Sequence, residues 1–158
     1  MDTYKLISIP NIGFGTYQLR NVDAYNMVLA AIKKGYRHID TAKLYGNELD
    51  IGRAIKDSKI NRGEIFVTTK VWITEIIGGP EKIIKSIKNS LIKLNLDYID
   101  LVLLHAPIPD KLITSWQTME DIYFGNIPLL KDKIRNIGVS NYNIQHLELI
   151  LMRCHLLS

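Results

Sequence analysis

The sequence has little or none of several features that would assign a protein to a specialised class. Its 158 residues contain one cysteine, Cys154, which excludes an internal disulfide and offers no thiolate cluster for a metal ion. A reducing compartment fits this usage best. No run approaches the roughly 18 consecutive apolar residues of a membrane-spanning helix, and the N-terminus lacks the apolar core of a secretory signal. We therefore expect a soluble, cytoplasmic protein with no membrane partner.

Extremes of charge are also absent. The net charge is +4, and the lysines are spread over several segments. A nucleic-acid-binding protein would show a basic stripe with interleaved aromatic residues, which is missing, although a slight positive field would favour a dinucleotide phosphate. With 47% hydrophobic and 23% charged residues, the composition is that of one globular domain over residues 1–158. We expect no nucleic-acid partner.

Two further site types are excluded by spacing. The histidines form no cluster with carboxylates of the kind that a catalytic metal needs, so we expect no metal site and interpret His38, His146 and His155 as structural or exposed. The run Gly13-Phe14-Gly15 is not a dinucleotide-binding fingerprint, because no third glycine opens a helix after it.

What is present is a set of short apolar runs that each end at a polar side chain. Asp40, Lys70, His105 and the pair Ser140 and Asn141 stand at these ends, at steps of 30, 35 and 35 residues. One strand with its crossover helix has this length. Because chemistry in parallel α/β proteins gathers at the carboxyl ends of the strands, we expect these side chains to lie together.

The hydrophobic spacing predicts a strand-and-helix unit used about five times. The expected strands cover residues 12–17, 37–41, 65–71, 99–104 and 137–139. The expected helices cover 22–34 with Gly35 as C-cap, a segment capped by Asn47, a segment starting at Pro80, 111–124, and a last helix from Asn141 or Asn143 to the chain end. Residues 4–9 are predicted as a hairpin arm and 125–132 as a loop insertion.

Buried faces are predicted for two of these helices. The helix at Pro80 carries an apolar stripe at helical spacing and keeps its lysines off it; the stripe is Ile83, Ile84, Ile87, Leu91 and Leu94. The last helix is expected to turn four residues inward, Leu147, Ile150, Leu151 and Cys154.

Tyr45 follows Asp40 by five residues and completes a set that suits proton transfer. A free phenol has a pKa of about 10 and is a poor acid near neutrality, but a nearby ammonium stabilises the phenolate. We interpret Tyr45 as the acid, tuned by Lys70 with Asp40 as its partner. His105 would orient a carbonyl oxygen or share the proton. Taken singly, Tyr45 is also compatible with a loop aromatic that packs on the barrel rim, and His105 with a satisfied core histidine.

These residues stand in ordered motifs through which the sequence resembles the aldo-keto reductases. The similarity runs from about Ile9 to about Leu149. The matching segments are Gly13-Phe14-Gly15-Thr16-Tyr17, residues 35–42 (GYRHIDTA) with 44–48 (LYGNE), 68–72 (TTKVW), 96–101 (LDYIDL) with Leu104-His105, and 137–143 (IGVSNYN).

The resemblance implies a (β/α)8 barrel of the TIM type that reduces aldehydes or ketones with a nicotinamide cofactor, NADP in the form NADPH. By the same resemblance Asp40, Tyr45, Lys70 and His105 are the catalytic tetrad. Trp72 together with His105 matches the positions that line the substrate pocket. The partner implied is a small carbonyl compound.

The cofactor contacts are also implied by the resemblance. Ser140 and Asn141 match the pair that holds the nicotinamide carboxamide. Thr16 and Tyr17 match the contribution of the first strand to the nicotinamide end. Asp40 belongs to this set as well as to the tetrad.

Length leaves two functions open. A barrel of this type takes about 250 residues, and this chain has 158, so we expect about the first five βα units, without the cofactor contacts that the family places on strands six to eight. The chain is then either an NADP-dependent reductase or a truncated, inactive relative that acts as a binding or assembly module. Unpaired first and fifth strands would favour a homodimer through these edges.

Overall fold

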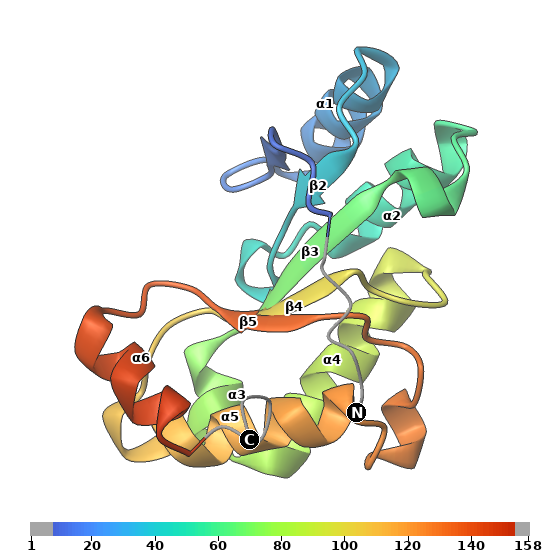
Figure 1. Cartoon of the computed structure of the whole chain (residues 1–158). Coiled ribbons are helices and arrows are strands. Elements are labelled where there is room, and N and C mark those ends of the chain that lie inside the picture. The colour runs from blue at the N-terminus through green and yellow to red at the C-terminus, as the bar shows by residue number, and fades with distance from the viewer. Residues whose placement is uncertain (1–7, 154–158) are drawn as a thin grey trace.

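The structure, a computed structural model, describes residues 8–153, and Figure 1 shows its arrangement. Five strands form one sheet in the order β1-β2-β3-β4-β5, and every neighbouring pair is parallel. At least one helix follows each strand, as in the first five units of a (β/α)8 barrel. The predicted fold is confirmed. The strands are β1 (Phe14–Gly15), β2 (His38–Asp40), β3 (Phe66–Val71), β4 (Leu101–Leu104) and β5 (Ile137–Val139).

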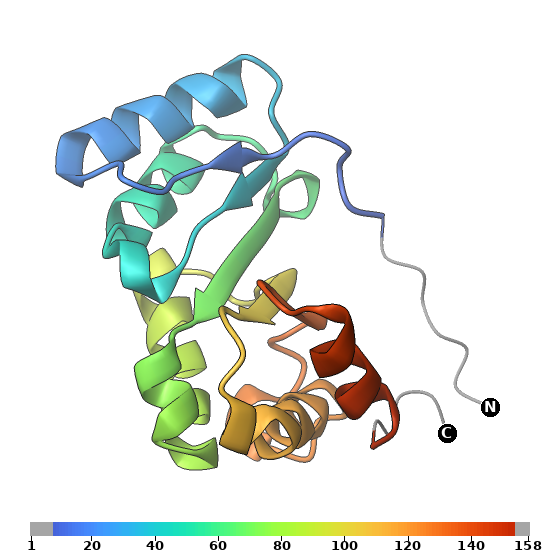
Figure 2. The ribbon, with the colours of Figure 1, turned by 90° about the vertical axis from the view of Figure 1, so that its left-hand side faces the viewer.

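The helices lie along one side of the curved sheet, whose outer strands are β1 and β5 (Figure 2). They are α1 (Asn21–Lys33), α2 (Glu48–Asp57), α3 (Ile73–Ile77), α4 (Pro80–Leu94), α5 (Leu112–Tyr123) and α6 (Ile144–Leu151). The short helix α3 is absent from the prediction, because five residues are too few to show a helical period. Within residues 8–153, no helix is both long enough and apolar enough to cross a membrane.

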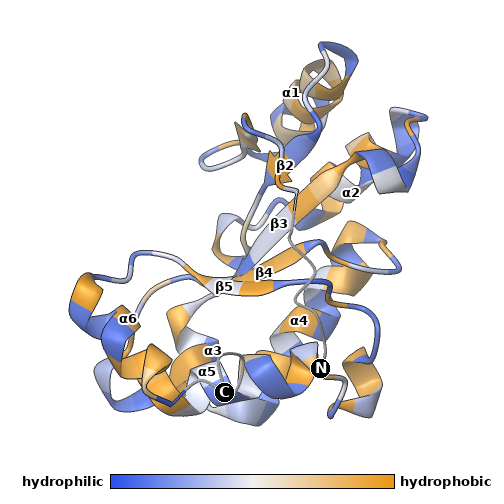
Figure 3. Cartoon of the chain, viewed as in Figure 1, coloured by the Kyte–Doolittle hydropathy of each residue, from blue (hydrophilic) through white to orange (hydrophobic). Residues whose placement is uncertain are grey.

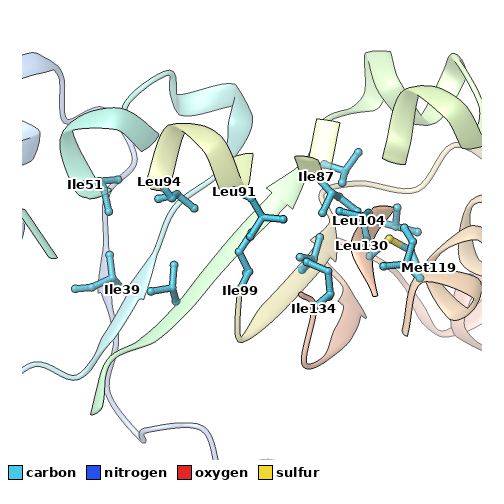
Figure 4. Packing of buried hydrophobic residues seen from close by; sticks show 14 of the residues in the cluster. Ile39, Ile51, Ile87, Leu91, Leu94, Ile99, Leu104, Met119, Leu130 and Ile134 are labelled. Atoms are coloured by element: carbon cyan, nitrogen blue, oxygen red, sulfur yellow. The ribbon is translucent and has the colours of Figure 1, made fainter. Parts of the chain in front are cut away.

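Helix α4 shows how the sequence sets these positions. Pro80 occupies its first turn as predicted, and Ile83, Ile87 and Leu94 are at most 1% exposed. Figure 4 shows this face packed with residues of β2, α2 and the segment around β4. In Figure 3 orange and blue stretches alternate along the helices, as expected of helices with one apolar and one polar face. An amphipathic stripe of this kind fixes which side of the helix meets the sheet.

Three predicted boundaries differ from the structure. The strand predicted over 99–104 is broken at Asp100, and Ile99 forms an isolated bridge to Ile134. The break has a physical reason: the carboxylate of Asp100 accepts the backbone N–H of Val67 at 3.0 Å, and this occupies a group of β3. Strand β1 is reduced to two residues. The loop insertion at 125–132 contains a short 3₁₀ turn whose Leu130 is fully buried.

The last helix was predicted only in part. Asn143, not Asn141, caps α6 by accepting the backbone N–H of His146 at 2.9 Å. Ile150 is buried at 4% exposure, but Leu147 and Leu151 are 40% and 53% exposed, because α6 packs chiefly against α5 alone. The predictions for Cys154 and for the arm at residues 4–9 fall wholly or largely outside the described residues.

A charged cluster holds the amino ends of β3 and β4 together. Asp100 accepts from Arg62 Nη2 at 2.6 Å and lies 3.7 Å from Arg135 Nη1. The two guanidinium groups also stack on the ring of Tyr98, with centroid distances of 4.1 and 3.4 Å. Asp100 is only 6% exposed, so these cations keep its buried charge paired.

Close helix packing makes one glycine testable. A Cβ at Gly52 in α2 would lie 2.1 Å from the backbone oxygen of Leu94 in α4, and backbone cannot yield as a flexible side chain does. We expect Gly52→Ala to lower the free energy of unfolding by about 1–3 kcal/mol, as overpacked sites do. Urea titration followed by circular dichroism measures this change. Gly63→Ala is the control, since nothing lies within 4 Å of its Cβ position; equal stabilities for the two variants would contradict the prediction.

Candidate active site

The carboxyl ends of the strands enclose a cleft of about 510 Å³. It gathers residues from every βα connection of the sheet, and nearly all of the predicted site residues are among them. The lining residues are Tyr17, Asp40, Leu44, Tyr45, Lys70, Trp72, His105, Ala106, Ser140 and Asn141.

Lys70 is the centre of this cleft. Its ammonium donates to Asp40 Oδ1 and to the backbone oxygen of Thr41 at 3.0 Å, and it lies 3.5 Å from the hydroxyl of Tyr45. The residue is 7% exposed. A buried ammonium has three hydrogens to satisfy and is costly without acceptors. Three oxygens, from the end of β2 and the loop after it, meet this requirement.

The strand register explains why Asp40 and Lys70 meet. Asp40 pairs with Thr68 across β2 and β3, and Lys70 follows Thr68 by two residues. Side chains two apart in a strand point to the same face, so Lys70 and Asp40 share the face that Thr68 occupies. Val67, in the opposite phase, is packed in the core beneath the helices. A shift by one residue would bury Asp40 in that core.

Tyr45 lies in a tight turn rather than on a strand. The 3₁₀ turn Lys43–Tyr45 ends at Gly46, whose φ of +70° suits glycine. Arg20 donates to the backbone oxygen of Tyr45 at 2.6 Å. The ring of Tyr17 lies against the ring of Tyr45 with a centroid distance of 5.1 Å. The hydroxyl is therefore held over the end of β3.

His105 is enclosed by aromatic rings. The ring of Trp72 lies edge to face at 4.8 Å and that of Tyr45 at 5.8 Å. Burial lowers the pKa of His105 below its usual 6.5, and the charge of Lys70 acts in the same direction while Asp40 opposes it. The ring is therefore neutral near pH 7, and one nitrogen carries a hydrogen while the other accepts. Within the described part of the chain, its buried Nδ1 has no hydrogen-bond partner.

Ser140 and Asn141 follow β5 and complete the wall. The amide of Asn141 donates to the backbone oxygen of His105 at 2.8 Å and to Ser140 Oγ at 3.0 Å. Asn141 has a φ of +62°, a conformation that asparagine tolerates better than most residues. The pair thereby ties the end of β5 to the end of β4.

Two of the predicted residues make contacts that the sequence did not indicate. Thr16 is fully buried and does not line the cleft, and its hydroxyl donates to the backbone oxygen of Asp40 at 3.0 Å and so supports Asp40. Its contact with a cofactor stays a prediction. Asn47 occupies the cap position of α2, but its side chain makes no capping bond. Its partners lie elsewhere: the amide of Asn47 contacts the first loop and the hydroxyl of Thr41. A polar residue directly before a helix is predicted to be its cap, whether its side chain bonds to the helix or to another part of the chain.

The sequence reasoning also missed Glu48 and Leu44. Glu48 is 2% exposed, and its carboxylate accepts from the hydroxyl of Thr69, next to Lys70. Leu44 lines the cleft and is partly exposed. Both residues belong to the segment 44–48, so their closeness to Tyr45 in the sequence is the feature that could have indicated a place in or beside the site. Among the described residues no group of three or more His, Cys, Asp or Glu could hold a metal ion.

Comparison with known proteins decides the family. The sequence profile of the Aldo/keto reductase family matches residues 11–156. The chain belongs to this family. Among curated aldo-keto reductase relatives, it is 45% identical over 148 residues to the glycerol 2-dehydrogenase (NADP(+)) of Saccharomyces cerevisiae, covering 90% of this chain and 45% of that protein. It is 43% identical over 155 residues to the glyoxal reductase of Bacillus subtilis, covering 95% and 53%.

Solved structures of the family agree with the fold. An aldo-keto reductase from a Medee basin deep-sea metagenome library superposes with a TM-score of 0.84 at 47% identity, over 94% of this chain and 52% of that one. An aldo-keto reductase of Bombyx mori in complex with NADP gives 0.81 at 33%, over 93% and 52%. The chain thus spans about half the length of the aldo-keto reductases that it matches.

Two histidines, the buried His105 and the half-buried His38, predict how stability depends on pH. Burial lowers the pKa of His38 and of His105, so the folded chain binds fewer protons than the unfolded chain once the pH falls below about 6.5. The free energy of unfolding must then decrease as the pH falls through this region. Urea titrations at pH 7.5 and 5.5 should give a smaller loss for His38→Gln than for the wild type. His146→Gln is the control, and an unchanged loss in His38→Gln would contradict the prediction.

Proposed function

We propose that the chain reduces the carbonyl group of small aldehydes or ketones with hydride from NADPH, and that Tyr45 is the general acid. The observation that carries this proposal is the contact set of Lys70, which joins Asp40 to the hydroxyl of Tyr45 inside the cleft. The relatives named glyoxal reductase and glycerol 2-dehydrogenase (NADP(+)) support a small substrate and this cofactor.

Carbonyl reduction needs a hydride at carbon and a proton at oxygen. NADPH, when bound, supplies the hydride. The hydroxyl of Tyr45 gives its proton to the oxygen as negative charge develops there. The ammonium of Lys70 stabilises the phenolate that remains, and Asp40 holds the ammonium in place. Because Lys70 is nearly excluded from water, its field on the phenolate is weakly screened.

His105 orients the carbonyl group. A neutral imidazole donates one N–H to the carbonyl oxygen without adding a second positive charge beside Lys70. The rings of Trp72 and Tyr45 fix the imidazole plane, and together these three side chains form an aromatic wall against which a small substrate would rest.

The cofactor end of the cleft fits a nicotinamide carboxamide. Both amide hydrogens of Asn141 are used inside the protein, so its Oδ1 is the acceptor that would be left to hold the carboxamide. Ser140 Oγ accepts from Asn141, and its own hydrogen would be the donor available to the same group. Tyr17 offers an exposed ring beside them. Asp40, the carboxylate of the proposed set, lines the same cleft.

The competing function, an inactive binding or assembly module, is not favoured, since all four groups for proton transfer converge in one cleft. A homodimer through β1 and β5 and a cytoplasmic location stay predictions. Light scattering of the purified chain during size exclusion tests the first: a mass of twice 18.1 kDa is expected if these edges pair, and a monomer would rule the dimer out.

The role of Tyr45 is tested by removing its hydroxyl. We expect Tyr45→Phe to lower kcat for methylglyoxal about 100- to 10,000-fold, the usual contribution of a positioned acid. NADPH binding, followed through the fluorescence of Trp72 and Trp116, should stay within a few-fold because the ring remains. Tyr123→Phe on α5 is the matched control. Wild-type turnover in Tyr45→Phe would remove Tyr45 from its role, and a folded wild type that neither binds NADPH nor turns over would end the proposal.

A further inference from the structure

Asn47 joins the two loops that carry the tyrosines of the cleft. Its side chain is buried, with the residue 1% exposed. The amide nitrogen donates to the backbone oxygens of Thr16 at 2.9 Å and Leu19 at 3.0 Å. The amide oxygen accepts from the hydroxyl of Thr41 at 2.9 Å. Every hydrogen-bonding group of the side chain is thus directed at a loop and none at the helix that it precedes.

The loops so joined are residues 16–20, after β1, and 41–46, after β2. The first carries Tyr17 and the second carries Tyr45, and their rings are in contact. Arg20 at the end of the first loop donates to the backbone oxygen of Tyr45. This second link comes from an exposed side chain, whereas the Asn47 link is shielded from water. The buried amide is therefore the firmer connection between the loops.

We propose that Asn47 is a positioning residue for Tyr45: it sets the spacing of the two loops and so keeps the tyrosine hydroxyl within reach of Lys70. The inference rests on the proposed reductase function, which it deepens. Asn47 touches neither the cleft nor the reacting atoms, and it acts through the loops alone.

An asparagine is the residue that this position requires. Two carbonyl oxygens need two donors and one hydroxyl needs an acceptor, and the asparagine amide supplies both at one fixed length. An aspartate has the same size but only accepts, so the oxygens of Thr16 and Leu19 would each lose a donor and face a carboxylate. The oxygen of Thr16 would keep only the backbone N–H of Leu19, at 3.2 Å. Losing donors to shielded carbonyls and placing a carboxylate against them is costly, and the loop 16–20 would move away from the loop 41–46.

The test compares Asn47→Asp with the same amide-to-carboxylate change at the exposed Asn89 of α4. Kinetics with methylglyoxal and NADPH, well below the melting temperature, should give a kcat about 10- to 100-fold lower for Asn47→Asp, the cost of a small misplacement of a catalytic group. KM for methylglyoxal should change less than threefold, because Trp72 and His105, which line the proposed substrate pocket, keep their positions. Asn89→Asp should match the wild type.

Hydrogen exchange gives a second readout that does not need turnover. Asn47→Asp should speed exchange in residues 16–20 and 41–46 together while β4 and α5 keep their protection. If the wild type neither binds NADPH nor turns over, the proposed function fails, and this paired change still supports the link between the loops. Faster exchange throughout the sheet would mean general destabilisation and would overturn the positioning role, as would an unchanged kcat in an active enzyme.

A milder variant keeps the test decisive if Asn47→Asp does not fold. Thr41→Val keeps the shape of the side chain and removes only the bond donated to Asn47 Oδ1. We expect kcat to fall by about threefold to tenfold, which lies between the values for Asn89→Asp and Asn47→Asp. Hydrogen exchange should increase more in residues 41–46 than in residues 16–20, relative to the wild type. Wild-type kcat and wild-type exchange in Thr41→Val would overturn the proposal.

Discussion

The need to satisfy one buried ammonium governs this end of the molecule. Lys70 stands in a strand that is buried over five consecutive residues, and it cannot reach bulk water as a surface lysine does. Its charge is tolerated only because Asp40, Thr41 and Tyr45 bring oxygens to it. The register of β2 on β3, the tight turn before Gly46 and the position of Tyr45 all serve that requirement.

The same requirement links folding to chemistry. An ammonium that must be paired in order to fold is also an ammonium fixed beside a phenol, so the groups that we propose for proton transfer would be preorganised before a substrate binds. Asn47 extends this order outward, because it joins the loop of Tyr45 to the loop of Tyr17 without entering the cleft. Rigidity at the site thus comes from residues of three successive βα units.

Much of this could be predicted from sequence, for physical reasons that differ by residue. The apolar runs and the helical spacing gave the order of strands and helices, since both periods are set by backbone geometry. Asp40, Lys70, His105 and Asn141 were expected together because parallel strands end at one edge. Residues whose partners are distant were not foreseen: Asn47 bonds to residues up to 31 positions away.

The contacts of Thr16 and Asp100 could not be predicted, for the same reason. A threonine at a strand end is compatible both with facing a ligand and with supporting the next strand, and nothing in the sequence shows that the Thr16 hydroxyl bonds to the Asp40 carbonyl. Likewise, nothing local tells that the Asp100 carboxylate will take a backbone N–H of β3 and end the regular pairing. Sequence patterns report which face a residue occupies, not which distant group it will meet.

The cluster around Asp100 lies at the opposite ends of the strands from the cleft. Its two arginines, the ring of Tyr98 and the carboxylate fasten β3 and β4 there without any residue of the proposed site. The contacts that hold β3 and β4 together and the residues of the proposed site therefore lie at opposite ends of the strands. Under the proposed function, substitutions in the loops around Leu44, Trp72 and Ala106 would alter the substrate end of the cleft while β3 and β4 stay joined at their opposite ends. Such a chain has room to diverge in specificity within an unchanged fold.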